Sequence, residues 1–184
     1  MALIFIFFGF TLVSSASISS KYYSSSYRNS FKSIRLDLPN VNLILSSPHA
    51  GSDMPNDLPN RTTGGCQTST SDTCTFYFNE TCSTGRRCSV TTVQDFADFD
   101  PFAERIVEEL YDQYRLLPYA VIAKWNRVKI DFNREINEAT FNHPKAIKAY
   151  EKYHNYLQRA IRKIERKFNG TGLLLDLHQH AQGK

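Results

Sequence analysis

The chain lacks three signals that each indicate a particular class of protein. None of its apolar runs is long enough for a comfortable membrane span, which takes about 20 residues. No CxxC pair is present, although structural zinc sites usually contain one. No recognised nucleic-acid-binding motif occurs either. A membrane-anchored protein, a zinc knuckle and a nucleic-acid-binding module are therefore disfavoured.

The composition is typical of one folded domain. Of the 184 residues, 41% are hydrophobic and 13% are aromatic, so the chain can bury a core. The net charge of +4 has a local origin, in a segment that we expect to be helical. The basic residues of this segment are Lys145, Lys148, Lys152, Arg159, Arg162, Lys163, Arg166 and Lys167. A solvated helix face explains such a cluster without a nucleic-acid partner.

The first 16 residues resemble a signal peptide. An apolar run is followed by small residues, with Ser14 and Ala16 in positions that a signal peptidase accepts. No basic side chain precedes the run, and the run is too short to anchor the protein in a membrane. We therefore expect a secreted protein whose domain covers residues 17–184.

All four cysteines fall within residues 62–92, a polar segment rich in Ser, Thr and Gly. They are Cys66, Cys74, Cys82 and Cys88. An even number of cysteines in a secreted chain predicts two disulfides, for which three pairings are open. Glycosylation sequons begin at Asn60, Asn79 and Asn169, and each asparagine would carry a glycan in the secretory route if it is exposed.

Apolar periodicity predicts an α/β fold. The expected strands cover residues 41–46, 119–125, 127–133 and 173–178. Residues 17–35 are expected to be irregular. One helix should begin at Asp100-Pro101, and a second should run from Pro144 to near Asn169-Gly170, because these residues favour helix ends. Helices that alternate with strands favour a largely parallel or mixed sheet, with ligands bound at the carboxyl ends of its strands.

Each predicted helix carries an apolar stripe that we expect to face the core. The stripe of the first helix is Phe102, Ile106, Leu110 and Tyr114. The stripe of the second helix is Ile147, Tyr150, Leu157, Ile161, Ile164 and Phe168.

Two of the predicted strands run into histidines. His49 follows the first strand, and Gly51 should leave room there for the backbone to approach a ligand. In the last strand, period-two alternation places Asp176, His178 and His180 on one face. We expect one shared cleft at this edge of the sheet. Two imidazoles and one carboxylate are a recurrent ligand set for catalytic zinc.

The third zinc ligand should come from a nearby loop or helix start. Asp98 and Asp100, in the sequence ADFDPF, are the candidates. Both have an ordinary alternative, because Asp100 is a good helix cap without any metal and Asp98 fits an exposed loop.

Five segments follow one another in an order that resembles the N-formylglutamate amidohydrolase family. They read SSPHAG, DFDPFAERIVEEL, NRVKIDFNR, YEKYHNYL and LLLDLHQH. The corresponding family patterns are PHxG, DxD before a helix, SRxVxDxNR, YHxxL and DxHS. The resemblance covers most of residues 40–180 and is interrupted by the cysteine-containing insertion, which is not typical of the bacterial members.

The resemblance implies a zinc-dependent amide hydrolase with a three-layer α/β fold like that of zinc carboxypeptidases. Its substrate would be an N-formyl or similarly N-acylated amino acid. Carried over by position, His49, Asp100 and His178 would hold one Zn²⁺ per chain. Asp98 and His180 are the alternative ligands.

Other residues of the matching segments imply roles in binding the substrate. Arg127 and Arg134 would hold a substrate carboxylate, or they would form structural salt bridges with Asp131 or a neighbour. His154 is either a buried core histidine or a residue that faces the cleft and positions the substrate. Asp176 would orient His178 or another imidazole.

The chain also departs from the family pattern. Gln179-His180 replaces the usual serine after the last histidine. Family members continue with further strands, where a glutamate is expected as the general base, whereas this chain ends at Lys184. We therefore expect a fragment, a truncated gene model or a shortened paralogue. Two functions remain open: a secreted zinc amidohydrolase, and a non-catalytic secreted binding paralogue that keeps the fold and the metal.

Overall fold

The computed structural model describes residues 22–26, 30–61 and 99–178. Several predictions lie outside these residues and keep their status as predictions: the signal peptide, the disulfide insertion at residues 62–92, the sequon at Asn79, and the alternative ligands Asp98 and His180.

The described residues form a five-stranded mixed sheet with strand order β1-β2-β4-β3-β5. The strands are β1 (Tyr23–Ser26), β2 (Phe31–Ile34), β3 (Leu43–Ser47), β4 (Tyr119–Ala123) and β5 (Leu173–Asp176). β3 pairs in parallel with both β4 and β5, whereas β2 pairs antiparallel with β1 and β4. The prediction of an α/β fold with a mixed sheet is confirmed.

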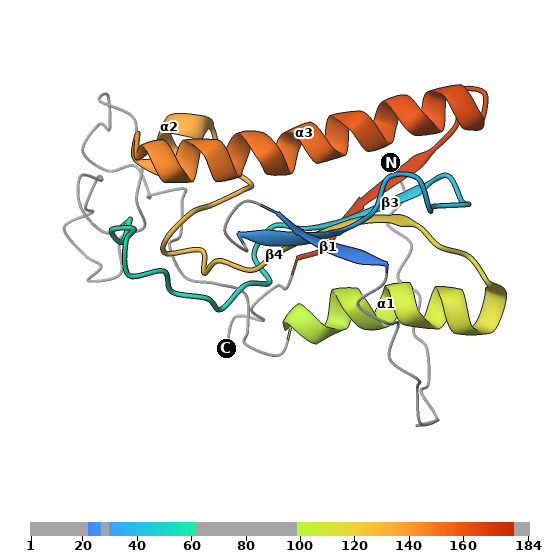
Figure 1. Ribbon diagram of the computed structural model, residues 1–184, viewed down its shortest axis with the longest axis horizontal. Coiled ribbons are helices and arrows are strands. Elements are labelled where there is room, and N and C mark those ends of the chain that lie inside the picture. The colour runs from blue at the N-terminus through green and yellow to red at the C-terminus, as the bar shows by residue number, and fades with distance from the viewer. Residues whose placement is uncertain (1–21, 27–29, 62–98, 179–184) are drawn as a thin grey trace, which may run out of the picture.

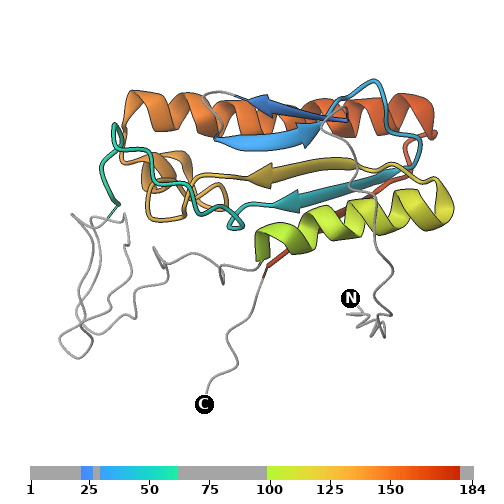
Figure 2. The same ribbon diagram turned by 60° about the horizontal axis from the view of Figure 1, so that its bottom comes forward.

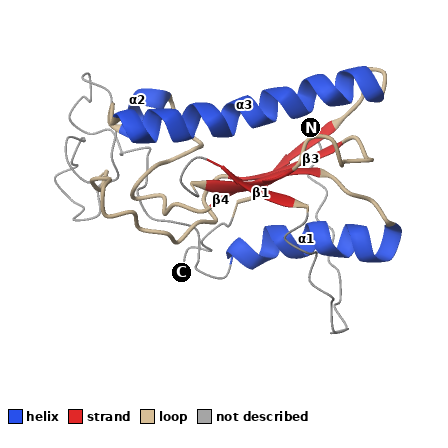
Figure 3. Ribbon diagram, viewed as in Figure 1, coloured by secondary structure: helices blue, strands red, loops and turns tan. Residues whose placement is uncertain are grey.

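Helices cover both faces of this sheet. They are α1 (Phe99–Tyr114), α2 (Ile136–Thr140) and α3 (Pro144–Lys167). Figures 1 and 3 show α3 along one face and α1 along the other, with the strands between them. Figure 2, turned by 60°, shows α1 lying beside β3 and β4. α3 begins at Pro144 as the sequence predicts, whereas α1 begins at Phe99, before the predicted start at Asp100-Pro101.

Side-chain alternation along the strands distributes the core between the two helices. Ile44 of β3 packs in the cluster under α3, whereas its neighbour Leu45 packs in the cluster under α1. In β4, Val121 and Ala120 divide in the same way. β4 is buried along its whole length, because it lies in the middle of the sheet.

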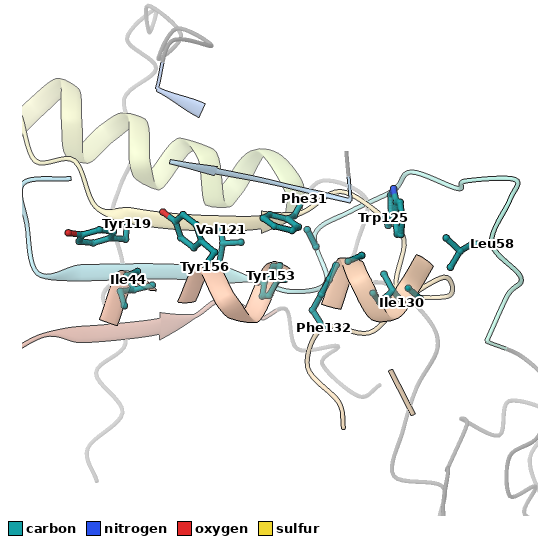
Figure 4. Close-up of a cluster of buried hydrophobic side chains, with 14 of the residues drawn as sticks. Phe31, Ile44, Leu58, Tyr119, Val121, Trp125, Ile130, Phe132, Tyr153 and Tyr156 are labelled. Atoms are coloured by element: carbon teal, nitrogen blue, oxygen red, sulfur yellow. The ribbon is translucent and has the colours of Figure 1, made fainter. Parts of the chain in front are cut away.

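The core beneath α3 is built from aromatic rings and small residues (Figure 4). The rings of Phe132 and Tyr153 stack with their centroids 4.4 Å apart, and Phe31 meets Tyr153 edge-on. Buried alanines on α3 let the helix approach the sheet closely. They are Ala146, Ala149 and Ala160.

The predicted helix stripes are only partly correct. On α3, Ile164 is buried and Tyr150 and Leu157 are partly buried, but Ile161 is 41% exposed. The buried row of α3 instead passes through Ala160 and Tyr156, because small and hydroxyl-bearing residues also pack inside.

On α1 the predicted stripe is wrong at both ends. Phe102 and Tyr114 are exposed, whereas Ile106 of the predicted stripe packs against the core, together with Ala103, Val107 and Tyr111. A spacing of four follows a row that drifts around an α-helix with 3.6 residues per turn. Side chains at the two ends of such a row cannot both face the sheet.

Two predictions of local structure are wrong. Residues 17–35 are not irregular throughout, because β1 and β2 form a hairpin at the sheet edge, where pairing with β4 outweighs the weak strand pattern. Residues 127–133 form turns rather than a strand. The Asn126 side chain accepts a hydrogen bond from the backbone of Val128, and its carbonyl accepts one from Lys129, which folds the chain back after β4.

The outer strand β5 is exposed along its whole length, and among the described residues it pairs only with β3. Its leucines, Leu173, Leu174 and Leu175, are between 40% and 55% exposed. Within the described residues, no helix has the length and apolar character required to cross a membrane.

Candidate functional site

Three parallel strands end at the same edge of the sheet and deliver the candidate residues there. β3 leads into His49, β4 leads through a turn into Arg127, and β5 leads into His178. The register pairs Ser46 with Asp176, so the segments that follow β3 and β5 leave the sheet side by side. The prediction that His49 and His178 share one edge is confirmed.

His49 is held by a buried carboxylate. Its Nε2 lies 2.7 Å from Oδ1 of Asp131, and both side chains are buried. An ionised carboxylate only accepts hydrogen bonds, so Nε2 of His49 is the donor. In the neutral ring, the lone pair is then on Nδ1.

Asp131 is the centre of a buried ionic cluster. Its Oδ2 accepts a hydrogen bond from Nε of Arg127 at 2.7 Å and lies 3.5 Å from Nη2 of Arg61. Burial alone would raise the pKa of Asp131, but the hydrogen bond from His49 and the nearby charges of His49, Arg127 and Arg61 outweigh it and hold the pKa well below its usual value. The carboxylate is therefore ionised and has a fixed orientation.

His178 lies against His49 at the open end of the site. The two ring centroids are 4.8 Å apart in an edge-to-face arrangement. Nε2 of His178 is 2.7 Å from Oδ2 of Asp176, as expected for a carboxylate that orients the ring. The amide of Asn133 lies 3.4 Å from the same nitrogen. Because His178 is 33% exposed, solvent reaches this side of the histidine pair.

The two candidate arginines have different surroundings. Arg127 is buried and paired with Asp131, which is the structural salt bridge that the sequence left open as one alternative. Arg134 is half-buried, donates through Nη1 to the carbonyl of Asn133, and has Nε 3.9 Å from Glu138. Arg134 is thus the more accessible guanidinium next to the residue that contacts His178.

His154 lies on α3 and contacts the backbone at Phe132, next to Asn133. Its Nε2 is 3.0 Å from the carbonyl oxygen of Phe132, and its ring lies against Tyr150 with centroids 4.1 Å apart. Burial lowers the pKa of His154, although the carbonyl and the charge of Asp176 act in the opposite direction. Through these contacts, His154 fixes the position of the backbone at Phe132, in the segment of residues 132–134.

The sequence does not reveal the role of Arg61. This side chain is buried and donates hydrogen bonds to the backbone carbonyls of Arg127, Glu138 and Ala139. It also forms an ion pair with Asp131. Its burial lowers its pKa to about 10. Arg61 lies in a loop that looks exposed because of its polar neighbours and the adjacent sequon. Only the tertiary contacts identify it.

One further local prediction needs correction. A Cβ atom on Gly51 would lie 2.2 Å from the carbonyl carbon of Lys124. This glycine therefore leaves room for the backbone at Lys124 rather than for a ligand. At the start of α3, His143 is the N-cap and accepts a hydrogen bond through Nδ1 from the backbone N–H of Lys145.

Two of the three predicted zinc ligands are placed together, and the third is not described as a ligand. Asp100 lies in the first turn of α1, and its side chain is outside the described part of the molecule. Among the described side chains, no group of three or more His, Cys, Asp or Glu residues is arranged to hold a metal ion. What the geometry does show is a histidine pair in which each ring is hydrogen-bonded to a carboxylate.

This arrangement is chemically suited to bind a cation and to transfer protons. Metal-ligating histidines commonly donate their second ring nitrogen to a carboxylate, as His49 does to Asp131. Imidazoles near neutral pH are also good general acids and bases. In comparisons with family models, curated proteins and solved structures, no match to this chain is found.

Proposed function

We propose that this protein is a zinc-dependent amidohydrolase that acts on an N-formyl or similarly N-acylated amino acid. The observation that carries the proposal is the contact between His49 and His178 at the carboxyl ends of two parallel strands. The matching sequence segments from residues 40–180 give the reaction class. A three-layer fold of the zinc carboxypeptidase type is part of the same proposal.

A zinc ion bound at this edge is part of the proposal. His49 and His178 would supply two nitrogen ligands, and Asp100, at the start of α1, would supply the third. When bound, zinc would polarise the scissile carbonyl and lower the pKa of a water molecule toward neutrality. Asp98 and His180 are the substitutes for Asp100 in this proposal.

Asp131 gives His49 its orientation and tautomer in this proposal. Because the carboxylate is anchored by two buried arginines, the ring of His49 has little freedom to rotate. Asp176 acts in the same way on His178.

Arg134 is our choice for the group that binds the substrate carboxylate. Arg127 is buried and paired with Asp131, whereas Arg134 is half-buried at 3.9 Å from Glu138 and adjoins Asn133. A guanidinium can form two parallel hydrogen bonds with a carboxylate, which would fix the acylated amino acid relative to the histidines. His154 supports this segment through the Phe132 carbonyl.

The secretory features belong to the same proposal. A signal peptide of 16 residues, two disulfides within residues 62–92 and glycans on exposed sequons would all fit an extracellular enzyme. Of the sequon asparagines in the described residues, Asn60 and Asn169 are both exposed. A decrease in the mass of the secreted protein after glycosidase treatment would test for these glycans.

The enzymatic test measures formate released from N-formylglutamate by the zinc-loaded protein, with and without a chelator. We expect turnover that a chelator abolishes and that zinc restores. The Arg134→Ala variant should raise KM for N-formylglutamate by about tenfold or more and leave kcat nearly unchanged, because it removes binding common to the ground and transition states.

N-formyl-leucine is the matched control substrate, since it lacks the side-chain carboxylate. An equal effect of Arg134→Ala on both substrates would mean that Arg134 contacts the α-carboxylate, which both substrates have, and not the side-chain carboxylate of N-formylglutamate. Stoichiometric zinc without turnover of any N-acylated amino acid would contradict the enzyme and favour the non-catalytic binding paralogue.

A further inference from the structure

The exposed side of α3 carries a continuous basic stripe, which the proposed hydrolase site does not use. Its side chains are Lys148, Lys152, Arg159, Lys163 and Arg166, and Lys145, which is half-buried and ion-paired with Asp57, continues it at the start of the helix. At 100° per residue these six positions fall within an arc of roughly 60°, and they extend over about 30 Å of helix. The sequence alone allows a scattered solvated face, whereas the helix aligns the charges in one row.

A surface cavity of about 510 Å³ runs beside this stripe, between α3 and the β1–β2 hairpin. Lys152, Arg159 and Lys163 line it from the helix, and Arg35 lines it from the segment after β2. The single acidic residue of the lining is Asp37, which accepts a hydrogen bond from Arg35 at 2.8 Å. The cavity therefore has an excess of positive charge.

The charges are spaced for a ligand with several anionic groups. Lys152 and Arg159 are about 10 Å apart along the helix axis, and Arg159 and Lys163 about 6 Å apart. The four basic residues of the lining and the rest of the stripe together carry more positive charge, over a longer distance, than one phosphate or sulfate ion can neutralise. A cavity of this volume has room for at least one sugar unit, while the rest of the stripe continues beyond it.

We propose that this surface binds a linear sulfated polysaccharide, which lies along the basic stripe with one unit in the cavity. Hydroxyl and amide groups for sugar contacts are present in the lining, at Ser24 and Asn155. Single-stranded nucleic acids instead need exposed aromatic rings on which bases stack. The two aromatic residues of the lining, Phe31 and Tyr156, are only 2% and 8% exposed, so they offer no such platform.

The test measures binding of a fluorescently labelled heparin oligosaccharide to the whole chain by fluorescence anisotropy at several salt concentrations. We expect Arg159→Gln/Lys163→Gln to raise Kd by about tenfold at 0.15 M salt and to reduce the salt dependence, because two contacts with displaced counterions are lost. The charge-retaining variant Arg159→Lys/Lys163→Arg should bind nearly as well as the wild type.

Arg105→Gln/Arg115→Gln is the matched control, because it removes the same charge from α1 and the residue that follows it, on the other face of the sheet. This variant should keep the wild-type Kd. Equal weakening by both double variants would show that net charge alone attracts heparin, and this would overturn the proposal. Equally tight binding of a single-stranded oligonucleotide of the same charge, or displacement of heparin by an equal concentration of inorganic sulfate, would also contradict it.

Discussion

At the scale of single residues, Asp131 determines the geometry of the site. One carboxylate oxygen orients His49, and the other balances Arg127 and Arg61. Both arginines and the histidine are buried, so each depends on this carboxylate for compensation of its desolvation. The orientation of His49 therefore depends on Asp131 keeping both arginine partners.

We predict that Asp131→Asn lowers the free energy of unfolding by about 3–5 kcal/mol, because two buried guanidinium groups then lose their counter-charge. Urea denaturation followed by circular dichroism measures the change. Asp57→Asn is the control, since the Asp57–Lys145 pair is exposed and should contribute under about 1 kcal/mol. A loss below about 1 kcal/mol in Asp131→Asn would mean that the cluster is not a structural requirement.

The pKa of His154 leads to a second prediction. Burial lowers this pKa below the usual value of 6.5, so the folded state favours the neutral ring. The stabilisation is present above about pH 6.5 and decreases as the pH falls below it, because the unfolded chain then takes up the proton more readily. Between pH 7 and pH 5 we expect His154→Gln to lose less stability than the wild type. Parallel pH profiles for the two proteins would contradict this assignment.

Single residues were predictable from the sequence where the signal is local. His49 and His178 follow apolar strands directly, so their shared edge could be predicted from alternation and from the rule that ligands bind at the carboxyl ends of such strands. Arg61 could not, because its partner Arg127 is 66 residues later in the chain. Its burial results from the fold and leaves no periodic signal.

At the scale of elements, α3 shows which of its residues pack against the sheet and which face solvent. The sequence predicts Ile161 and Ile164 in one apolar stripe, but the structure buries only Ile164. The long basic side chains and Ile161 face outward, while alanines let the helix lie close to the strands.

We therefore predict a large difference between two similar substitutions on α3. Ile164→Ala should lower the free energy of unfolding by about 2–5 kcal/mol, since it leaves a cavity in the core. Ile161→Ala should cost about 1 kcal/mol or less, because its side chain is partly in water in both states. Thermal and urea denaturation measure both values, and comparable losses would show that the helix is rotated relative to the structure described above.

Helices and central strands were predictable because their patterns are long or strongly apolar. The turns at residues 127–133 were not, because Val128, Ile130 and Phe132 alternate with polar residues as in a strand. Yet the intervening Asp131 is buried as well, in the ionic cluster, and the Asn126 side chain initiates a turn. The β1–β2 hairpin was missed because its strands are short and rich in serine, and its stability comes from pairing with β4.

At the scale of the whole molecule, the sheet topology joins residues that are far apart in the chain. The parallel arrangement of β4, β3 and β5 brings His49, Arg127 and His178 to one edge, and the helices on both faces bury the strands that carry them. The basic stripe of α3 lies on the outer side of the same framework. Catalysis and polyanion binding would thus use different surfaces of one domain.

The most direct test of the proposed zinc site is the zinc content of the purified protein, measured by mass spectrometry after zinc loading and removal of free metal. We predict about one zinc per chain in the wild type and less than a tenth of that in His178→Ala. Circular dichroism of the variant shows whether its fold is retained, and Asn155→Ala, on the basic surface, is the control that should keep its zinc. Full zinc content in folded His178→Ala, or none in the wild type, would contradict the proposed site.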